Sequence, residues 1–232
     1  MKTRFLLFLL FSVVLTACAQ KNTQNEYGLK IVNDYKTYLA NVAQNPNLEL
    51  VEIKKAIPSV VLDIRYATTN NFMKQVMYKQ ARAFARKPVV EKLKLIQAEL
   101  NKKGYGLKIY DGYRPYAVTV DFYEKSDDNA RENSFVADPK KGSKHNRGCA
   151  VDLSIIDLKT GKDVPMPTPY DSFKAEASPT YNNLPANIIK NRDFLIDTMH
   201  AYGFKVISNE WWHFDFVGWE NYYLMDIPFE KL

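Results

Sequence analysis

Two residue types that bind metals stand close together in the segment SKHNRGCAVD, residues 143–152. His145 is one of three histidines in a chain of 232 residues, and Asp152 follows it seven positions later inside an apolar run. An imidazole nitrogen and a carboxylate oxygen can share one divalent ion, and Gly148 lets the chain bend between them. The same two side chains could instead form a simple hydrogen bond at a loop end. Taken alone, this segment leaves both interpretations open.

The segment NEWWHFDF, residues 209–216, holds a second histidine, His213, three positions after Glu210. Side chains three apart on a regular strand face opposite ways, so we place Glu210 in a turn that begins at Asn209. A bend there could bring the carboxylate beside the imidazole without making it a metal ligand. Two histidines and one carboxylate, with a fourth position for water, form a catalytic zinc arrangement, and a free Glu beside that water is the expected general base. The alternative is a core hairpin in which Glu210 only caps the turn.

A third candidate is Arg114 in YDGYRPYAV, residues 110–118, between an expected strand and an expected helix. The helix macrodipole disfavours a cation just before the first turn. A planar donor held there despite that penalty suits a carboxylate or a developing oxyanion, although surface arginines are common. We expect His200 to be an ordinary helix residue and Cys149 to be a buried thiol.

Hydrophobic periodicity indicates the elements that must position these side chains. Alternation in CAVDLSII, residues 149–156, predicts a strand on which Asp152 points away from the core face, toward small neighbours that leave room for binding. Helices are expected within residues 31–42, 88–103, 116–125 and 186–202, and strands at 60–68, 106–114 and in a hairpin over 204–218. Because helices and strands alternate without a steady βαβ rhythm, we predict a single α+β domain, a mostly antiparallel sheet with flanking helices.

The N-terminus predicts export. Two positive charges precede the apolar run FLLFLLFSVVL, which is too short for a comfortable membrane span and is followed by small residues. The ending LTAC resembles the lipobox of bacterial lipoproteins, in which the cysteine is acylated and becomes the first mature residue. We therefore assign residues 1–17 to a signal peptide, 18–28 to a lipid anchor on Cys18 and a polar tether, and 29–232 to the functional domain. The expected location is a membrane surface, periplasmic or outside the cell.

The composition of the chain indicates which classes of binding partner to expect. The formal charge of +6 becomes +4 once Lys2 and Arg4 leave with the leader, and no nucleic-acid-binding motif accompanies this modest excess. The mature chain keeps one cysteine, so no internal disulfide can form. We expect no nucleic-acid partner, and nothing indicates an obligate protein partner.

Five segments, in order, resemble D-alanyl-D-alanine dipeptidases, which are zinc peptidases related to the D,D-carboxypeptidases and to the amino-terminal hedgehog domain. They are DIRYATTNNF, the Tyr-Arg-Pro segment at Arg114, SKHNRGCAVDLSI, MPTPYDSF and EWWHF. The resemblance covers most of the chain from about Val51 onward. Five ordered segments with compatible spacings are far more specific than one histidine and one aspartate.

This resemblance implies one zinc ion per chain, held by His145, Asp152 and His213, and hydrolysis of D-Ala-D-Ala derived from cell-wall peptidoglycan. It further implies that Glu210 is the general base and that Arg114 stabilises the tetrahedral intermediate.

The resemblance also implies how the dipeptide is anchored. In such enzymes its free amino end is held by a serine two residues before the first ligand and by the aspartate of an M-G-T-x-F-D loop. The matching positions here are Ser143 and Asp171. The loop departs from the pattern, since Pro167 replaces the glycine and Tyr170 replaces the phenylalanine.

Two other functions fit the same residues. A D,D- or L,D-carboxypeptidase acting on peptidoglycan stem peptides would use the same metal centre with an open end. A zinc-stabilised binding module without hydrolysis would need the metal ligands but neither Glu210 nor Arg114. A structural lipoprotein without a metal is a third, more remote alternative.

Overall fold

The computed structural model describes residues 24–132 and 135–232, so the predicted signal peptide and Cys18 lie outside the described residues. The helices of the described part are α1 (Tyr35–Gln44), α2 (Ile53–Ala56), α3 (Lys87–Lys102), α4 (Tyr116–Lys125), α5 (Asp128–Glu132) and α6 (Ala186–Ala201). The strands are β1 (Ile31–Val32), β2 (Leu50–Glu52), β3 (Val61–Leu62), β4 (Phe84–Arg86), β5 (Tyr105–Asp111), β6 (Ala150–Asp157), β7 (Phe204–Val206), β8 (His213–Phe216) and β9 (Leu224–Met225).

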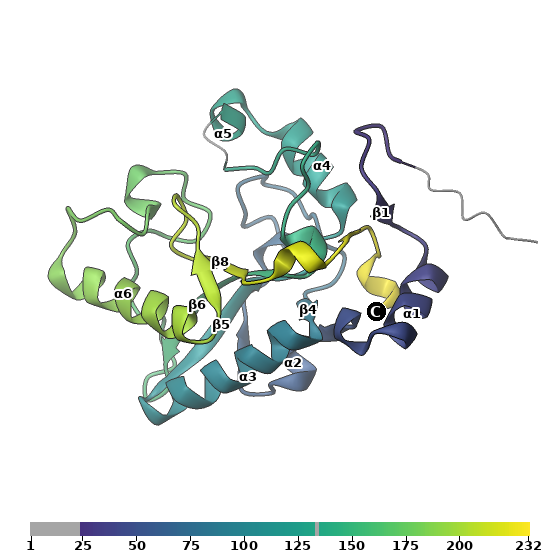
Figure 1. Cartoon of the computed structure of the whole chain (residues 1–232). Coiled ribbons are helices and arrows are strands. Elements are labelled where there is room, and N and C mark those ends of the chain that lie inside the picture. The colour runs from purple at the N-terminus through teal and green to yellow at the C-terminus, as the bar shows by residue number, and fades with distance from the viewer. Residues whose placement is uncertain (1–23, 133–134) are drawn as a thin grey trace, which may run out of the picture.

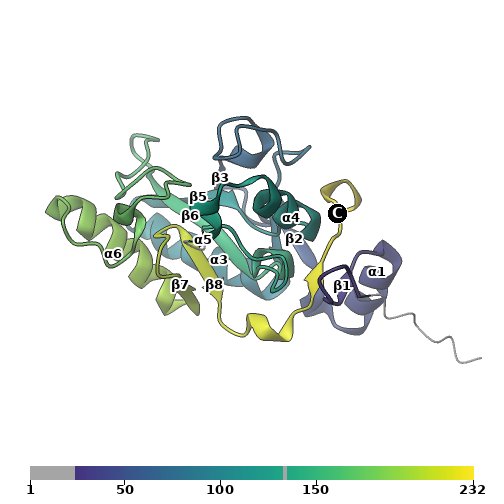
Figure 2. The same cartoon turned by 90° about the horizontal axis from the view of Figure 1, so that it is seen from above.

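A five-stranded sheet in the order β3-β5-β6-β8-β7 forms the centre of the fold. Its pairs β5–β6, β6–β8 and β7–β8 are antiparallel, whereas β3 at the edge runs parallel to β5. Helices α3 and α6 lie on one face of this sheet, and α4 and α5 lie on the other (Figure 1; Figure 2). The prediction of an α+β fold with a mostly antiparallel sheet is confirmed.

Helix α3 shows how the sequence pattern produces this layering. Pro88 stands in the first turn, where a missing amide hydrogen removes no helix hydrogen bond, and Gly104 ends the helix with a φ of 83°. The apolar stripe of the helix is fully buried against the sheet side: Val89, Leu93, Ile96 and Leu100. The expected helix at 88–103 therefore exists within one residue of its predicted bounds.

The strand expected over residues 60–68 is much shorter than its β-branched sequence indicates. Only Val61–Leu62 forms the strand β3, and a 3-10 turn follows at Arg65–Ala67. The carbonyl of Tyr66 accepts hydrogen bonds from the amides of Met77 and Tyr78, at 2.8 and 2.9 Å. This tertiary contact turns the chain away from β5, so the predicted strand does not continue.

The first helix also begins later than the apolar spacing from Ile31 suggests. Asp34 caps α1 by accepting a hydrogen bond from the amide of Thr37 at 2.8 Å. Ile31 lies before this cap, in β1, where it pairs with Leu224 of the parallel strand β9. The spacing from Ile31 to Val42 therefore spans a strand, a cap and a helix.

The chain that leads into the domain lies against it from residue 24 onward. Gln24 pairs with Lys30 in an isolated bridge, and Asn25 donates from Nδ2 to the hydroxyl of Tyr116 at the start of α4, at 2.9 Å. The last residues of the expected tether, 24–28, are thus in contact with the domain. Among the helices that the structure describes, none is both long enough and apolar enough to cross a membrane.

Candidate metal centre

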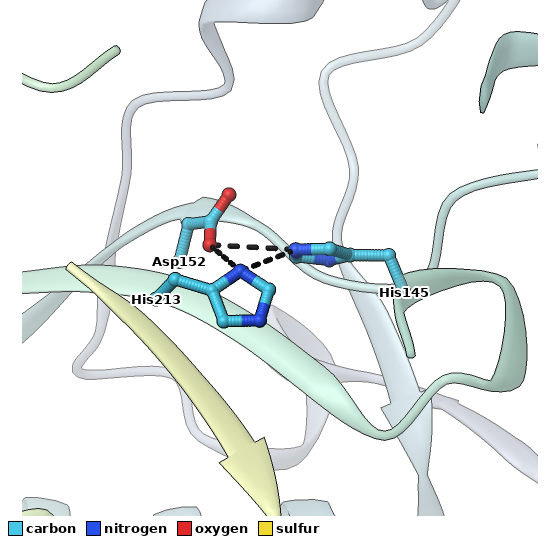
Figure 3. Close-up of side chains that lie close together, drawn as sticks. All are labelled: His145, Asp152 and His213. Atoms are coloured by element: carbon cyan, nitrogen blue, oxygen red, sulfur yellow. Dashed lines mark hydrogen bonds and ion pairs between the residues drawn. The ribbon is translucent and has the colours of Figure 1, made fainter. Parts of the chain in front are cut away.

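The strand pairing places two of the predicted ligands opposite each other. Asp152 on β6 is the direct register partner of His213 on β8, and residues opposite one another in an antiparallel pair share a face of the sheet. His145 begins the 3-10 turn His145–Arg147 just before β6, and Gly148 ends this turn with a left-handed φ of 70°. The three side chains converge from the sheet and the turn, as Figure 3 shows.

Three atoms form a small triangle that fits a metal ion. His145 Nε2 lies 3.1 Å from His213 Nδ1 and 3.4 Å from Asp152 Oδ1, and His213 Nδ1 lies 3.1 Å from Asp152 Oδ1. Tetrahedral zinc with bonds of about 2.0 Å places its ligand atoms roughly 3.3 Å apart, which these distances match. The Oδ1 atom of Asp152 is buried and accepts no hydrogen bond from any described residue. The donor set and its spacing therefore fit zinc.

The electrostatics of the cluster also favour a cation. Burial by itself would lower the pKa of His213, but the neighbouring carboxylates of Asp152 and Asp215 raise it to about 10. Burial by itself would raise the pKa of Asp152. The two imidazoles, of which His145 has the larger effect, instead hold this pKa far below its usual range. The site thus stabilises positive charge where the ligand atoms meet, and a metal ion can supply that charge.

Each imidazole is oriented through its other ring nitrogen. His145 Nδ1 donates to the carbonyl of Gly112 at 2.7 Å, and His213 Nε2 donates to Oδ1 of Asp215 at 2.9 Å. Such partners set the tautomer and leave the opposite nitrogen free for the metal. Neither the carbonyl of Gly112 nor Asp215 was predicted from the sequence. Asp215 carried a signal, since it lies two residues after His213 on one strand and so on the same face, whereas nothing local marks the carbonyl of Gly112.

The alternation pattern predicted room for binding around Asp152, and Asp152 does line a cavity, although the strand around it is buried. Every residue from Ala150 to Ile156 is buried. The hydroxyl of Tyr170, from a distant loop, donates to Asp152 Oδ2 at 3.0 Å. The expected space for binding is therefore present beside Asp152, although Tyr170 covers one side of the carboxylate. Cys149, as expected, is a buried thiol, and His200 is exposed on α6.

Glu210 lies in the bend before β8, where the amide of His213 contacts its carbonyl at 3.4 Å. Its Oε2 atom is 3.7 Å from His213 Nδ1, so the carboxylate lies beside the triangle and is not one of its corners. Burial, together with the charge of Asp152, raises the pKa of Glu210 to about 7. A carboxylate in this position and with this pKa can exchange a proton near neutral pH.

Arg114 is buried and is held by a residue that the sequence analysis did not single out. Its Nε and Nη2 atoms donate to Oδ2 of Asp111 at 3.1 and 2.7 Å. Its guanidinium also lies over the ring of Phe122, 4.7 Å from the centroid. The carboxylate of Asp111 offsets the unfavourable position before α4, so the cation can stay in the protein interior.

Ser143 and Asp171 approach the same region from two loops. The Ser143 hydroxyl accepts the amide of His145 at 3.2 Å and so helps to shape the ligand turn. Asp171 Oδ1 accepts from the hydroxyl of Tyr66 at 3.0 Å, but its Oδ2 is shielded and has no hydrogen-bond partner among the described residues. Burial first, then the charge of Asp152, raise the pKa of Asp171 well above its usual range. Among the described residues this carboxyl group forms no salt bridge, although the charge of Arg114 acts against the rise in its pKa.

One cavity of about 460 Å³ unites the predicted site. Its lining includes every site residue proposed from the sequence within the described part: Arg114, Ser143, His145, Asp152, Asp171, Glu210 and His213. Its lining also includes Phe122 and Tyr123 of α4 and residues 135–138. The arrangement therefore combines three metal-ligand atoms, one adjacent carboxylate, one guanidinium and one unpaired carboxylate in a single pocket.

Comparisons with known proteins identify relatives of this chain. A family model described as D-ala-D-ala dipeptidase matches residues 46–226. The D-alanyl-D-alanine dipeptidase of Escherichia coli K12 is 30% identical over 167 residues, which are 72% of this chain and 84% of that protein. The enzyme of the same name from Enterococcus faecium is 29% identical over 178 residues, which are 70% and 88% of the two chains.

Among solved structures, the LD-carboxypeptidase LdcB matches with a TM-score of 0.39 and 22% identity over 60% of this chain and 61% of its own. The family model spans well over half of the sequence, from before β2 to just after β9. The chain therefore belongs to the D-Ala-D-Ala dipeptidase family of peptidases.

Proposed function

We propose that this chain is a zinc-dependent dipeptidase that cleaves D-Ala-D-Ala. The observation that carries the proposal is the meeting of three ligand atoms, a separate buried carboxylate and a buried guanidinium in one cavity. A site that only stabilised the fold would need neither Glu210 nor Arg114. Membership of the family supports the substrate class, because the relatives named above are D-alanyl-D-alanine dipeptidases.

His145, Asp152 and His213 would hold one zinc ion per chain. When bound, zinc supplies a Lewis acid for the scissile carbonyl and lowers the pKa of a water molecule to about 7. The outer contacts to Gly112 and Asp215 keep both imidazoles turned toward that position.

Glu210 acts as the general base. It accepts a proton from water as the new carbon–oxygen bond forms, and it delivers this proton to the amine nitrogen as the carbon–nitrogen bond breaks. Arg114 donates to the carbonyl oxygen as negative charge develops on it. Among the described residues its Nε and Nη2 atoms are engaged with Asp111, which leaves Nη1 for a substrate oxygen.

Asp171 would measure substrate length. Its shielded and unpaired Oδ2 needs a cation, and the ammonium group of a free dipeptide supplies one. Ser143, two residues before His145 and a lining residue of the same cavity, would contact the same amino end. A longer peptide has an uncharged amide at this place, so it would leave the carboxylate without its partner.

The test is a comparison of substrates with the zinc-loaded protein. Release of D-alanine is measured from D-Ala-D-Ala, from L-Ala-L-Ala and from a stem pentapeptide that ends in D-Ala-D-Ala. We expect rapid turnover of the free D,D-dipeptide and little of the other two. Rapid turnover of the pentapeptide with none of the dipeptide would instead establish a carboxypeptidase. Zinc binding without hydrolysis of any substrate would leave a binding module.

We also propose that the protein is an exported bacterial lipoprotein, anchored through Cys18 on the periplasmic or outer side of a membrane. This rests on the charged start, the short apolar run and the LTAC junction of the sequence. A Cys18→Ser variant should leave the membrane fraction, and mass spectrometry of the wild-type N-terminus should find an acylated cysteine. An unmodified N-terminus at Met1 would contradict this proposal.

A further inference from the structure

The two carboxylate oxygens of Asp152 have different surroundings. Oδ1 lies 3.4 Å from His145 Nε2 and 3.1 Å from His213 Nδ1, and it accepts no hydrogen bond from a described residue. Oδ2 points the other way and accepts the hydroxyl hydrogen of Tyr170 at 3.0 Å. One oxygen is therefore available to a metal, and the other is held by a neutral donor.

The donor itself is fixed by packing. The Tyr170 ring is buried and stacks on Tyr110, with centroids 4.4 Å apart and an angle of 13° between the planes. The indole of Trp212, one residue before the ligand His213, meets Tyr170 edge-on at 5.6 Å. Contacts on a face and an edge leave the phenol little freedom, so its hydroxyl is preorganised toward Asp152.

The backbone conformation of Asp171, the residue after Tyr170, explains how two neighbouring side chains of one loop contact different partners. Asp171 has a φ of 61°, the left-handed conformation that non-glycine residues rarely adopt and that Asp tolerates better than most. In extended chain, neighbouring side chains point to opposite sides. The left-handed residue breaks this alternation, so Tyr170 reaches Asp152 while Asp171 reaches Tyr66 beside the same cavity.

We propose that Tyr170 is a positioning residue for the metal-ligating carboxylate of Asp152, an inference that rests on the proposed zinc site. Its hydroxyl fixes the rotation of the carboxylate so that Oδ1 alone faces the two imidazoles. Without the hydroxyl, Oδ2 becomes a second buried acceptor without a partner, and the group is free to turn about its Cβ–Cγ bond. Partners of this kind change metal affinity by roughly 10–100-fold.

The residue type makes this a clean experiment. The loop pattern that the sequence resembles has phenylalanine at this position, so Tyr170→Phe should keep the stack and the fold while it removes one oxygen atom. Tyr110→Phe is the matched control. It removes the same atom from the other ring of the stack, whose charged neighbours include Lys108 and Arg65, 5.6 and 5.9 Å from the ring centroid.

Zinc affinity is measured by competition with a chromophoric chelator, and the visible spectrum of the cobalt(II) form reports the ligand geometry. We expect Tyr170→Phe to bind zinc roughly 10–100-fold more weakly and to shift or change the intensity of the cobalt bands. Tyr110→Phe should match wild type in both. Thermal unfolding of the metal-free proteins reports any general loss of packing stability. Such a loss by itself would not alter the cobalt spectrum.

A Tyr170→Phe protein with wild-type zinc affinity and a superimposable cobalt spectrum would overturn the inference. Equal changes in the Tyr110→Phe control would also overturn it, because the effect would then come from the stack and not from the hydroxyl. Neither readout requires turnover. A wild-type protein that binds zinc but cleaves no dipeptide would therefore refute the proposed activity while the assignment of Tyr170 is still decided by its own measurements.

Discussion

Asp152 and His213 face each other across the antiparallel strands β6 and β8, with Asp152 Oδ1 3.1 Å from His213 Nδ1. Sixty-one residues separate them in the sequence, and the sheet register alone brings them together. A slip of one residue between the strands would turn either side chain to the opposite face. The proposed metal centre is thus a consequence of strand pairing, and His145 completes it from the turn just before β6.

Replacing the proposed base should separate metal binding from catalysis. Glu210→Gln keeps the size and the hydrogen-bonding reach of the side chain but cannot accept the proton of water. We expect zinc content to stay near one ion per chain and the turnover of D-Ala-D-Ala to fall roughly 10²–10⁴-fold. Glu220→Gln, an exposed change nearby, is the control. Normal hydrolysis by Glu210→Gln would remove Glu210 from the mechanism.

The guanidinium geometry of Arg114 should matter as much as its charge. Arg114→Lys keeps a cation near Asp111 but loses the two-nitrogen contact at 3.1 and 2.7 Å, and it cannot present a further nitrogen to the substrate. Steady-state kinetics should show kcat lower by roughly 10²–10³-fold with a smaller change in KM. Arg131→Lys, which lines the same cavity, should retain most of the activity. A change confined to KM would mean that Arg114 only binds the substrate.

Removing the charge of Asp171 should change recognition of the amino end. Asn tolerates the left-handed φ of 61° and can keep the contact with Tyr66, so Asp171→Asn should fold normally. We expect kcat/KM for D-Ala-D-Ala to fall roughly 10–100-fold, the range for a lost charge-assisted hydrogen bond, with zinc affinity unaffected. Asp138→Asn in the same cavity is the control. If both variants hydrolyse the dipeptide like wild type, the ammonium is bound elsewhere.

The close approach of Gly112 to the backbone of Phe84 should leave no room for a side chain at position 112. A Cβ atom at Gly112 would lie 2.4 Å from the carbonyl oxygen of Phe84, a rigid backbone atom. Gly112→Ala should lower the free energy of unfolding by roughly 1–3 kcal/mol, measured by urea denaturation. It should also weaken zinc binding, because the Gly112 carbonyl orients His145.

Gly106→Ala on the same strand is the matched control for this prediction. Its Cβ would meet mainly flexible side chains, with Leu158 Cδ2 nearest at 3.1 Å. It should therefore be much milder than Gly112→Ala. Equal losses of stability in the two variants would show that the contact with the Phe84 carbonyl is not the cause.

The ion pair of Glu52 should give part of the stability a defined pH dependence. Glu52 Oε2 accepts from Arg82 Nη2 at 2.7 Å, and Arg82 also donates to the carbonyl of Phe229, which ties the C-terminal turn to β2. The hydrogen bond from Arg82 lowers the pKa of Glu52 below its usual value of 4.5. Since the folded state has the lower pKa, this stabilisation is complete above pH 4.5 and is lost as the pH falls through the folded-state value.

Urea unfolding of wild type and Glu52→Gln should therefore differ by a constant amount, roughly 1 kcal/mol or less, at pH 6–7. The difference should shrink below pH 4.5 as Glu52 becomes protonated. A gap that stayed constant into acid would mean that Glu52 acts through packing and not through its charge.

The residues of the candidate site could be proposed from the sequence. The three candidate ligands and the candidate base could be proposed because the chain has only three histidines, two of them in segments that also hold a carboxylate, and the bend that places Glu210 beside His213 followed from strand periodicity. The helix α3 and the antiparallel sheet were equally predictable, since apolar spacing and flanking Pro and Gly residues are local signals.

Partners that come from distant segments had no such signal. The carbonyl of Gly112 and the hydroxyl of Tyr170 act on His145 and Asp152 only after the chain has folded. The early end of β3 also arose from a tertiary contact, the two amides that bind the carbonyl of Tyr66.

The sequence by itself therefore determined which groups are present and which helices and strands carry them, because composition and periodicity are properties of the chain. Only the tertiary structure decided which oxygen of Asp152 faces the imidazoles and which side chains are left without a partner in the cavity. Those properties depend on distances of about 3 Å between residues far apart in sequence, and such distances are set by strand register and loop packing.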